Sequence, residues 1–470
     1  MSEVSIDEVV VGEHYVLTPD GKIYYPEEFT GGDEGFRALL AKEALGERRS
    51  YKRSPHIDIM KRLKLAEVEP LSDAGHLTYL PKGALVTDLL MDYSLSVVRR
   101  VGGIPVKTSI MYDLNIPAIK EHANLFGQRM YKVKPFKREF VLRYAACFGQ
   151  FALLRRHYLT HRDLPLRIFE LADSYRYEQR GEVTGLARPR RFYMPDLHIL
   201  TAGLEEAMAE FKNIFRLIMD EGQKFGWTYY NLYNVVEDFM RERFDFLVEL
   251  VRMEGKPALI YVVESGKYYW VINIEFHYID SQGRPLETAT VQIDIGNSRR
   301  FGIKYHDVDG SVKYPVILHT AIHGSVERFL YEFLEEAAKM QNSGKKPMLP
   351  VWLSPTQVRI IPVSSAYLDY AYNILLMIRD ADIRVDIDDR DISLSKKVMH
   401  AEREWVPYIV VIGEKEVKSN RLTVRVRSMG GKAVEMTLDE LIDRVRGELD
   451  GYPFRQLYYS ERLSMRPEFI

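Results

Sequence analysis

Two side chains of opposite charge, Arg176 and Glu178, stand two residues apart in this 470-residue sequence. They end the stretch LRIFELADSYRYE, whose β-branched and aromatic residues predict a strand, so both should lie on one face. The turn that follows is rich in arginine, and Gly181, Gly185 and Pro189 break the strand pattern. Because arginine can bind phosphate oxygens in pairs, the hairpin suits a polyanion. A surface hairpin with a solvated basic tip explains the same pattern equally well.

The strand that returns from this turn, FYMPDLH, brings three more chemical groups together. Phe192, Met194, Asp196 and His198 occupy alternate positions, so they should share a face. That face would combine a flat aromatic ring, a carboxylate and an imidazole that could bind a metal ion. The two strands together predict a concave site that can hold charged and flat ligands.

A second chemical element begins at Tyr314 with YPVILHTAIHGSVERFLYEFLEEAAKM. It predicts a short apolar strand, a glycine turn and a helix, because Val326, Phe329 and Phe333 follow helical spacing. Arg328 enters this helix just after the turn. Taken alone, Arg328 could simply pair with a neighbouring carboxylate on a solvated face.

Together these two elements resemble motifs 2 and 3 of the class II aminoacyl-tRNA synthetases. The flanking HRDLPLR and FYMPDLH make the chain most similar to the threonyl-tRNA synthetase family. The resemblance implies that Arg176 holds the α-phosphate of ATP and the amino acid carboxylate, while Glu178 reads the adenine amino group. It also implies that Phe192 stacks on adenine and that Arg188 and Arg328 hold the γ-phosphate.

Cys147 is the single cysteine of the chain, so no intramolecular disulfide can form, and a reducing compartment is expected. Spacing alone does not predict a metal site, because the sequence has no local C-x-x-C or H-x-x-x-H pair around this cysteine. The resemblance, however, implies a zinc ion held by Cys147, His198 and His319. Three protein ligands leave coordination positions open, which is typical of a working site rather than a structural one.

Open positions on zinc would explain how threonine is told apart from the nearly isosteric valine. An apolar pocket separates such pairs by only about 1 to 3 kcal/mol, whereas a metal can bind the amino group and the hydroxyl together. The resemblance adds Asp196 as a contact to that hydroxyl, and Thr290 and Gln292 as pocket residues. His122 matches a histidine proposed to assist transfer to tRNA, although it could equally be an ordinary surface helix residue. Mg²⁺ is expected to accompany ATP.

The resemblance implies an α/β (α+β) fold. We expect a class II core of antiparallel sheet flanked by helices, followed by a small mixed-sheet α/β anticodon-binding domain. Motif 1 should span about 84–112 as a helix followed by a strand, and it implies a homodimer. The expected division of the chain is an N-terminal extension at 1–54, a catalytic domain at 55–341, a linker at 342–350, an anticodon-binding domain at 351–457 and a tail at 458–470. Motifs 2 and 3 should span about 167–200 and 314–340.

The expected anticodon-binding domain alternates strand and helix patterns, which indicates crossover connections. By resemblance, Glu416 and Arg425 would contact anticodon bases, since unpaired loop bases are open to such side chains. Alternating charges on an exposed strand remain the alternative explanation of these two residues. Thr437 and Glu440 form a candidate capping box at the start of the last helix.

Charge and composition limit the partners and the location that can be expected. The formal net charge of −2 neither requires nor excludes nucleic acid binding, so basic character must be local. The N-terminal stretch lacks a long apolar run, which predicts a cytoplasmic protein with no membrane segment.

Motif 1 begins before residue 90, so we expect a short form without the N-terminal editing domain of many family members. The product mischarged with serine should then be cleared by a separate editing protein. The expected partners are therefore ATP, L-threonine, tRNA(Thr), a second subunit and that editing protein. Two alternatives stay open: another class II synthetase, for serine or proline, and a noncatalytic tRNA-binding paralogue.

Overall fold

The computed structural model describes residues 2–47 and 53–467, which divide into two compact units. The first unit comprises Met1–Ser54, Ala74–His76 and Ser94–Glu332, and the second comprises Pro55–Asp73, Leu77–Tyr93 and Phe333–Ile470. Two of the five passages of the chain between the units lie within α3 (Pro81–Arg100) and α10 (Val326–Asn342). No helix in the described ranges combines the length and apolar character needed to cross a membrane.

The first unit is built on an eleven-stranded sheet in the order β1-β3-β2-β14-β13-β15-β16-β19-β12-β11-β6. Neighbouring strands are antiparallel except at the β13/β14 and β6/β11 pairs, so the expected antiparallel core is confirmed. The strands are β1 (Glu3–Val4), β2 (His14–Leu17), β3 (Ile23–Tyr24), β6 (Ile104–Pro105), β11 (Leu166–Tyr175), β12 (Arg191–Thr201), β13 (Tyr229–Val236), β14 (Ala258–Val263), β15 (Trp270–Ile279), β16 (Pro285–Asp294) and β19 (Val316–Ala321).

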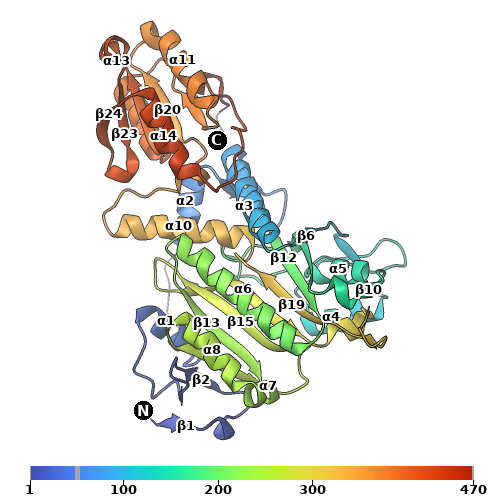
Figure 1. Ribbon diagram of the computed structural model, residues 1–470. Helices are drawn as coiled ribbons and strands as arrows, with labels where there is room; N and C mark the ends of the chain where they lie inside the picture. Colours follow the sequence, from blue (N-terminus) through green and yellow to red (C-terminus); the bar gives the residue numbers. More distant parts are fainter. Residues whose placement is uncertain (1, 48–52, 468–470) are drawn as a thin grey trace. The chain divides into compact units, whose positions relative to one another are not determined.

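Helices α6 (Leu204–Lys224) and α8 (Phe244–Glu254) lie side by side over one face of this sheet (Figure 1). Phe215 of α6 packs on Phe276 of β15, with ring centroids 5.3 Å apart. Because side chains alternate along a strand, Val291 of β16 shares that face and is fully buried, whereas Thr290 and Gln292 point the other way. One sheet face is therefore mostly apolar core, and the other carries the polar side chains of Thr290 and Gln292.

The remaining elements of the first unit are short. Its other helices are α1 (Glu34–Glu43), α4 (Pro117–Phe126), α5 (Cys147–Leu154), α7 (Glu237–Glu242) and α9 (Asn297–Phe301). Two small sheets join β7 (Met111–Asp113), β9 (Phe140–Leu142) and β8 (Lys132–Val133), and β10 (Leu159–Thr160), β17 (Tyr305–His306) and β18 (Val312–Lys313). The expected helix and strand of motif 1 correspond to α3 and β6.

The hairpin expected around residues 167–200 is formed by β11 and β12, with one difference. The strand expected to reach Glu178 ends at Tyr175. Beyond that point the Glu178 amide donates to the carbonyl of Arg176, and the Tyr177 amide donates to Arg129. Arg176 still pairs across the hairpin, because its amide donates to the Arg190 carbonyl at 2.8 Å, so only Glu178 is positioned by a turn rather than by strand alternation.

The second unit contains a five-stranded sheet in the order β21-β20-β22-β23-β24. The first three strands are parallel and the last two antiparallel, which confirms the expected mixed sheet. Its elements include α2 (Pro55–Arg62), β4 (Ala66–Val68), β5 (Leu77–Tyr79), β20 (Val358–Pro362), α11 (Leu368–Arg379), β21 (Val385–Ile387), α12 (Leu394–Arg403), β22 (Tyr408–Ile412), α13 (Glu414–Ser419), β23 (Leu422–Val426), β24 (Lys432–Met436) and α14 (Leu438–Leu449). The predicted capping box of Thr437 and Glu440 is present at the start of α14.

A buried ionic network joins the C-terminal segment to this sheet. Arg359 has no exposed side-chain surface, and its Nε and Nη2 donate to the two oxygens of Asp386 at 2.8 and 2.9 Å. Arg359 also donates to Glu404 at 3.0 Å, and Arg466 donates to Asp386 at 2.8 Å. Removing one member would leave uncompensated buried charge.

Asp386→Asn should therefore lower the free energy of unfolding of the second unit by about 3 kcal/mol, because Arg359 and Arg466 lose their shared carboxylate. Denaturant unfolding of the full chain measures this. Asp391→Asn makes the same chemical change at an exposed position and should shift stability by less than about 0.5 kcal/mol. Equal losses in the two variants would contradict the buried-network account.

Candidate active site

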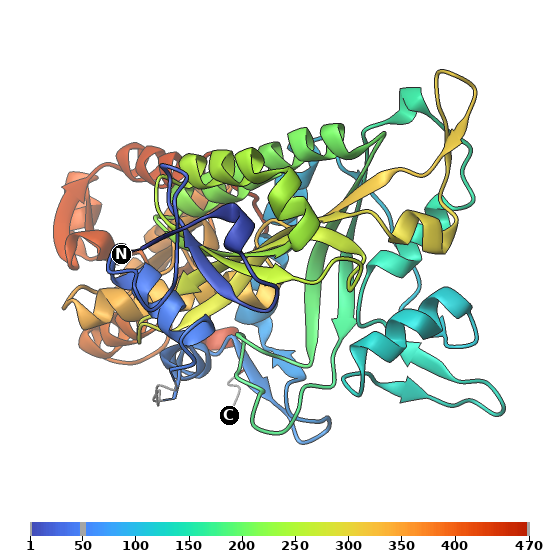
Figure 2. The ribbon, with the colours of Figure 1, turned by 90° about the horizontal axis from the view of Figure 1, so that it is seen from below.

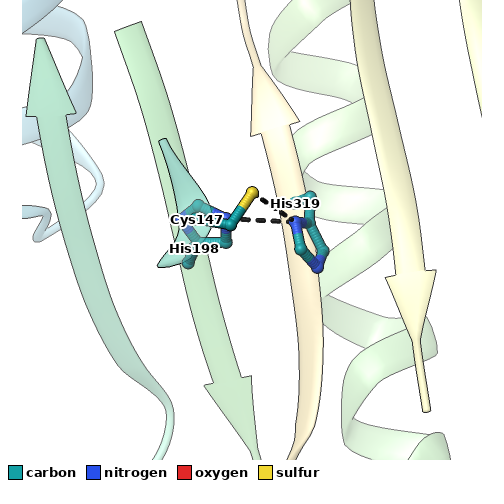
Figure 3. A group of neighbouring side chains, drawn as sticks. All are labelled: Cys147, His198 and His319. Carbon is teal, nitrogen blue, oxygen red and sulfur yellow. Dashed lines mark hydrogen bonds between the residues drawn. The ribbon is translucent and has the colours of Figure 1, made fainter. Parts of the chain in front are cut away.

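Three potential metal ligands meet on the polar side of the large sheet. His198 of β12 and His319 of β19 face each other across the strand pair, and Cys147 approaches from the start of α5 (Figure 3). The ligand atoms all lie within 4.8 Å of one another. His198 Nε2 is 3.0 Å from His319 Nδ1, which is 3.6 Å from Cys147 Sγ. The three residues are thus brought together from distant parts of the chain.

The outer nitrogen of each imidazole is fixed by a hydrogen bond. His319 Nε2 donates to the Asp294 carboxylate at 2.7 Å, and His198 Nδ1 donates to Gln150 Oε1 at 2.9 Å. The orientation of the Gln150 amide is supported by its Nε2, which donates to the carbonyl of Asp196 at 3.2 Å. Because the protons are on His319 Nε2 and His198 Nδ1, the other two nitrogens, His319 Nδ1 and His198 Nε2, direct their lone pairs toward each other.

Burial shifts the pKa values of His198 and of the neighbouring Asp196. It lowers the pKa of His198 well below its usual value, so the ring is neutral at physiological pH. Burial raises the pKa of Asp196 to about 6, while its Oδ2 accepts from Cys147 Sγ at 3.8 Å. Two imidazoles whose inner nitrogens face each other, beside a thiol, form a donor set that a soft cation would satisfy.

The cluster opens into a cavity of about 530 Å³. Eight predicted site residues line it: His122, Cys147, Arg176, Phe192, Asp196, Thr290, Gln292 and His319. His198 is fully buried behind its wall, and Glu178, Arg188 and Arg328 do not line it. The cavity thus combines a metal-type donor set with a cationic and aromatic end.

At the cationic end, Arg176 lies between two aromatic rings. Its guanidinium carbon is 5.2 Å from the ring centre of Phe192 and 5.7 Å from that of Phe126, and its Nε donates to the Tyr144 carbonyl at 3.2 Å. Burial, followed by the nearby Arg328, lowers the pKa of Arg176. Two cations in one partly desolvated place favour a polyanionic ligand.

The remaining motif residues lie beside this end and contact one another. Glu178 is 5% exposed and accepts from Arg188 Nε at 3.0 Å. Arg328 Nε donates to the carbonyl of Ala187 at 3.2 Å, and its Nη1 is 3.5 Å from Glu287. The motif 3 helix is therefore tied directly to the motif 2 turn.

The pocket residues on the central strands are held by local hydrogen bonds. Thr290 Oγ1 lies 3.0 Å from Asn273 Oδ1 and 3.0 Å from the Ile274 carbonyl. Gln292 lies opposite Asn273 in the strand register, on the same side as Thr290. These side chains line the cavity between the metal-type cluster and the outer strands.

Gln150, Asp294 and Tyr269 belong to the site but were not among the residues predicted from the sequence. Gln150 lies one helical turn after Cys147, and Asp294 lies two residues after Gln292, so their faces could have been read from spacing. Tyr269 lines the cavity with its ring 5.8 Å from His319 and 6.0 Å from His122. Nothing in the spacing of the sequence marks that loop tyrosine.

The predicted anticodon residues differ in exposure. Arg425 projects from β23 into solvent. Glu416 is 7% exposed, and it accepts from the Gly413 amide at 2.9 Å and from Thr423 Oγ1 at 2.6 Å. The Glu416 carboxylate therefore caps α13 here, whereas Arg425 is open to a ligand.

The family models match both halves of the chain. A tRNA synthetase class II core domain (G, H, P, S and T) matches residues 131–337, and an anticodon binding domain matches residues 357–448. The threonine–tRNA ligase of Pyrobaculum calidifontis is 47% identical over 97% of this chain and 74% of its own length. The ligase of Hyperthermus butylicus is 45% identical with the same coverage.

The chain belongs to the threonine–tRNA ligase family. It spans 74% of the length of these ligases. Among solved structures, the RNA binding domain of threonyl-tRNA synthetase from Cryptosporidium parvum Iowa II aligns with a TM-score of 0.74 at 24% identity, covering 85% of this chain and 99% of that one. This supports the fold of the ligase family, and the predicted family and class II core are confirmed. The serine, proline and noncatalytic alternatives are not favoured.

His122 offers a pH test of the cavity of this ligase. Burial lowers the pKa of His122 to about 4 from an ordinary value of 6.5, and Arg300 adds to the effect. The unfolded chain therefore takes up this proton first, so the free energy of unfolding should fall as the pH drops from about 6.5 to about 4. His122→Phe should remove that part of the pH dependence, measured by denaturant unfolding at several pH values. An imidazole resonance of His122 that titrates near pH 6.5 would contradict this result.

Proposed function

We propose that this chain is a threonine–tRNA ligase that activates L-threonine with ATP and transfers it to the 3′ end of tRNA(Thr). The observation that carries the proposal is the cavity itself. The Cys147, His198 and His319 cluster and the Arg176–Phe192 pair open into one space, so an amino acid and a nucleotide can meet there.

Zinc fits the Cys147, His198 and His319 donor set. The lone pairs of the two imidazoles face each other 3.0 Å apart and repel one another unless a cation lies between them. Burial raises the pKa of the Cys147 thiol, so Cys147 would lose its proton and act as a thiolate ligand only beside such a cation. When bound, zinc supplies open coordination positions that accept the amino group and the side-chain hydroxyl of threonine.

The amino acid end of the cavity is then completed by side chains of the central strands. Asp196 has a pKa of about 6, so it is mostly ionised at pH 7 and can accept a hydrogen bond from the threonine hydroxyl. Thr290 and Gln292 line the same end and can position the backbone of the amino acid. Valine offers no hydroxyl to Asp196, so the buried carboxylate would lose its hydrogen-bond partner.

At the nucleotide end, the flat ring of Phe192 suits the adenine base, and Glu178 suits its amino group. Arg176 lies where it can hold the α-phosphate and the threonine carboxylate together. Arg188 and Arg328 suit the γ-phosphate, with Mg²⁺ accompanying ATP. In the first step the carboxylate oxygen attacks the α-phosphorus and pyrophosphate leaves, while these cations offset the developing charge.

In the second step a terminal ribose hydroxyl of the tRNA attacks the carbonyl of threonyl-adenylate, and AMP leaves. His122 lines the cavity and is neutral at physiological pH, so it can accept the hydroxyl proton. Its Nδ1 is 3.2 Å from the Tyr144 hydroxyl, which orients the ring. We propose this role for His122 on that position and protonation state.

The proposed function also requires tRNA, a second copy of the chain and a separate editing protein. Arg425, and Glu416 after release from its capping role, would contact the anticodon, and two chains would pair through motif 1. The proposed location is the cytoplasm, where tRNA is charged. Serine carries the hydroxyl that this cavity selects, so we infer that the mischarged product is cleared by a separate editing protein.

The test of the function is threonine-dependent exchange between ATP and pyrophosphate, repeated with serine, valine and proline. Threonine should support strong exchange, serine weaker exchange, and valine about 10⁴-fold less, because the site is built around a hydroxyl. Zinc removal with a chelator, or Cys147→Ser, should abolish exchange. Exchange with serine or proline but not threonine would indicate a sibling synthetase, and none with any amino acid would indicate a noncatalytic protein.

The second test concerns the carboxylate behind His319. Asp294→Asn should weaken zinc affinity about 10- to 100-fold, because the amide no longer strengthens the imidazole as a ligand. Titration against a competing chelator measures this without any enzymatic assay. Asp309→Asn, at a carboxylate with 60% side-chain exposure, is the matched control and should leave zinc affinity unchanged. Equal affinities in both variants would show that Asp294 does not act on the ligand.

A further inference from the structure

One surface beside the cavity has no role in the activation step. Strands β8 and β9 form a hairpin over residues 131–142, YKVKPFKREFVL, which we call the basic hairpin (Figure 2). Residues 132–138 are all exposed, and the segment carries four cationic side chains against one carboxylate. Its cations are Lys132, Lys134, Lys137 and Arg138.

The tip of the basic hairpin holds an aromatic ring in solvent. Phe136 is fully exposed, with a relative exposure of 104%, and its backbone has a φ of +54°. A bulky side chain rarely adopts that conformation, and an exposed phenyl ring gains nothing from water. Both features are unfavourable in the free protein, which suggests that the ring is presented to a ligand.

The charges of the basic hairpin are only partly balanced. Glu139 lies 3.6 Å from Lys132 and 3.5 Å from Lys134, so one carboxylate serves two cations. Arg138 pairs with Asp113 at 2.5 Å. Among the described residues, Lys137 has no carboxylate within 4 Å. The surplus is positive and solvated, which favours a polyanion as the occupant.

The basic hairpin is fixed to the motif 2 turn at its base. The ring of Tyr131 packs edge-on against Tyr177 at 5.2 Å, and the Tyr177 amide donates to the Arg129 carbonyl at 3.1 Å. Arg129 also donates to Glu182 at 2.8 Å. At the other end, β9 leads within two residues to Tyr144, which lines the active-site cavity. The hairpin therefore flanks that cavity.

We propose that the basic hairpin binds the single-stranded 3′ end of the tRNA, with phosphates on its lysines and one unpaired base stacked on Phe136. This rests on the proposed function and adds the surface that guides the reacting end. An aromatic ring stacks on an unpaired base and not on a paired one, and the 3′ end is the part of the tRNA that must enter the cavity. Phosphate contacts from Lys134 and Lys137 would hold the strand in register.

The first experiment separates this binding from the activation step. Phe136→Asn removes the ring, and asparagine tolerates a positive φ, so folding should be preserved. Its KM for tRNA in aminoacylation should rise ~10-fold, within the range for the loss of one stacked base, while threonine-dependent ATP–pyrophosphate exchange stays unchanged. Phe136→Trp should restore the KM. An unchanged KM in Phe136→Asn would overturn the proposal, whereas loss of exchange in the unaltered chain would instead overturn the proposed function.

Direct binding tests the hairpin without catalysis. The probe is a short single-stranded RNA with the tRNA 3′ sequence, compared with the same strand in a duplex. Lys134→Ser should weaken binding of the single strand and reduce the slope of log affinity against log salt by about 0.7. Lys212→Ser is the matched control, because Lys212 lies on α6, which covers the other face of the sheet. Equal affinity for duplex and single strand, or equal effects of the two lysine variants, would overturn the proposal.

Discussion

The register between β12 and β19 is the constraint on which the site depends. It places His198 directly opposite His319, and the two rings meet with their centres 4.6 Å apart. A shift of one strand by one residue would turn its histidine to the face covered by α6 and separate the pair. Cys147 can join them only because α5 begins beside this strand pair. The hydrogen bonds that the imidazoles donate to Gln150 and Asp294 then leave each lone pair facing inward, so sheet geometry and local polar contacts together define the donor set.

The same sheet carries both ends of the cavity. Side chains of the β11/β12 hairpin supply the aromatic and cationic end, while β16 and β19 supply the polar end. Neighbouring strands lie about 4.8 Å apart, so moving across a few strands covers the length of an amino acid joined to a nucleotide. Arg328 reaches the turn between the hairpin strands through Ala187. Residues of motifs that are distant in sequence thus lie around one sheet.

The parts that could be predicted from sequence were those with local patterns. Strand alternation placed Phe192, Asp196 and His198 on one face, and helical spacing located the element after Gly324. Features that depend on contacts between distant segments were not visible. The strand ends at Tyr175, and beyond it the Tyr177 amide donates to the carbonyl of Arg129 from a separate segment. The Glu416 carboxylate, which caps α13 through the Gly413 amide, also accepts from Thr423 of β23 and is buried there. Cys147, His198 and His319 could be grouped only through family resemblance, because their proximity depends on strand register.

The polar face of the sheet also buries ionisable groups whose charged forms are unfavourable there. Burial, with Glu287 and Glu43 nearby, raises the pKa of Glu275 to about 8, and burial lowers the pKa of the adjacent His277 to about 4. Each shift records a group whose charged form is disfavoured in the free protein. The opposite face is mostly apolar under α6, although burial also raises the pKa of Glu254 of α8, which accepts from Tyr233 of β13, to about 7. Packing on one face of the sheet can therefore stabilise the fold while the other face holds buried ionisable groups. A ligand of complementary charge would stabilise the charged forms of those groups.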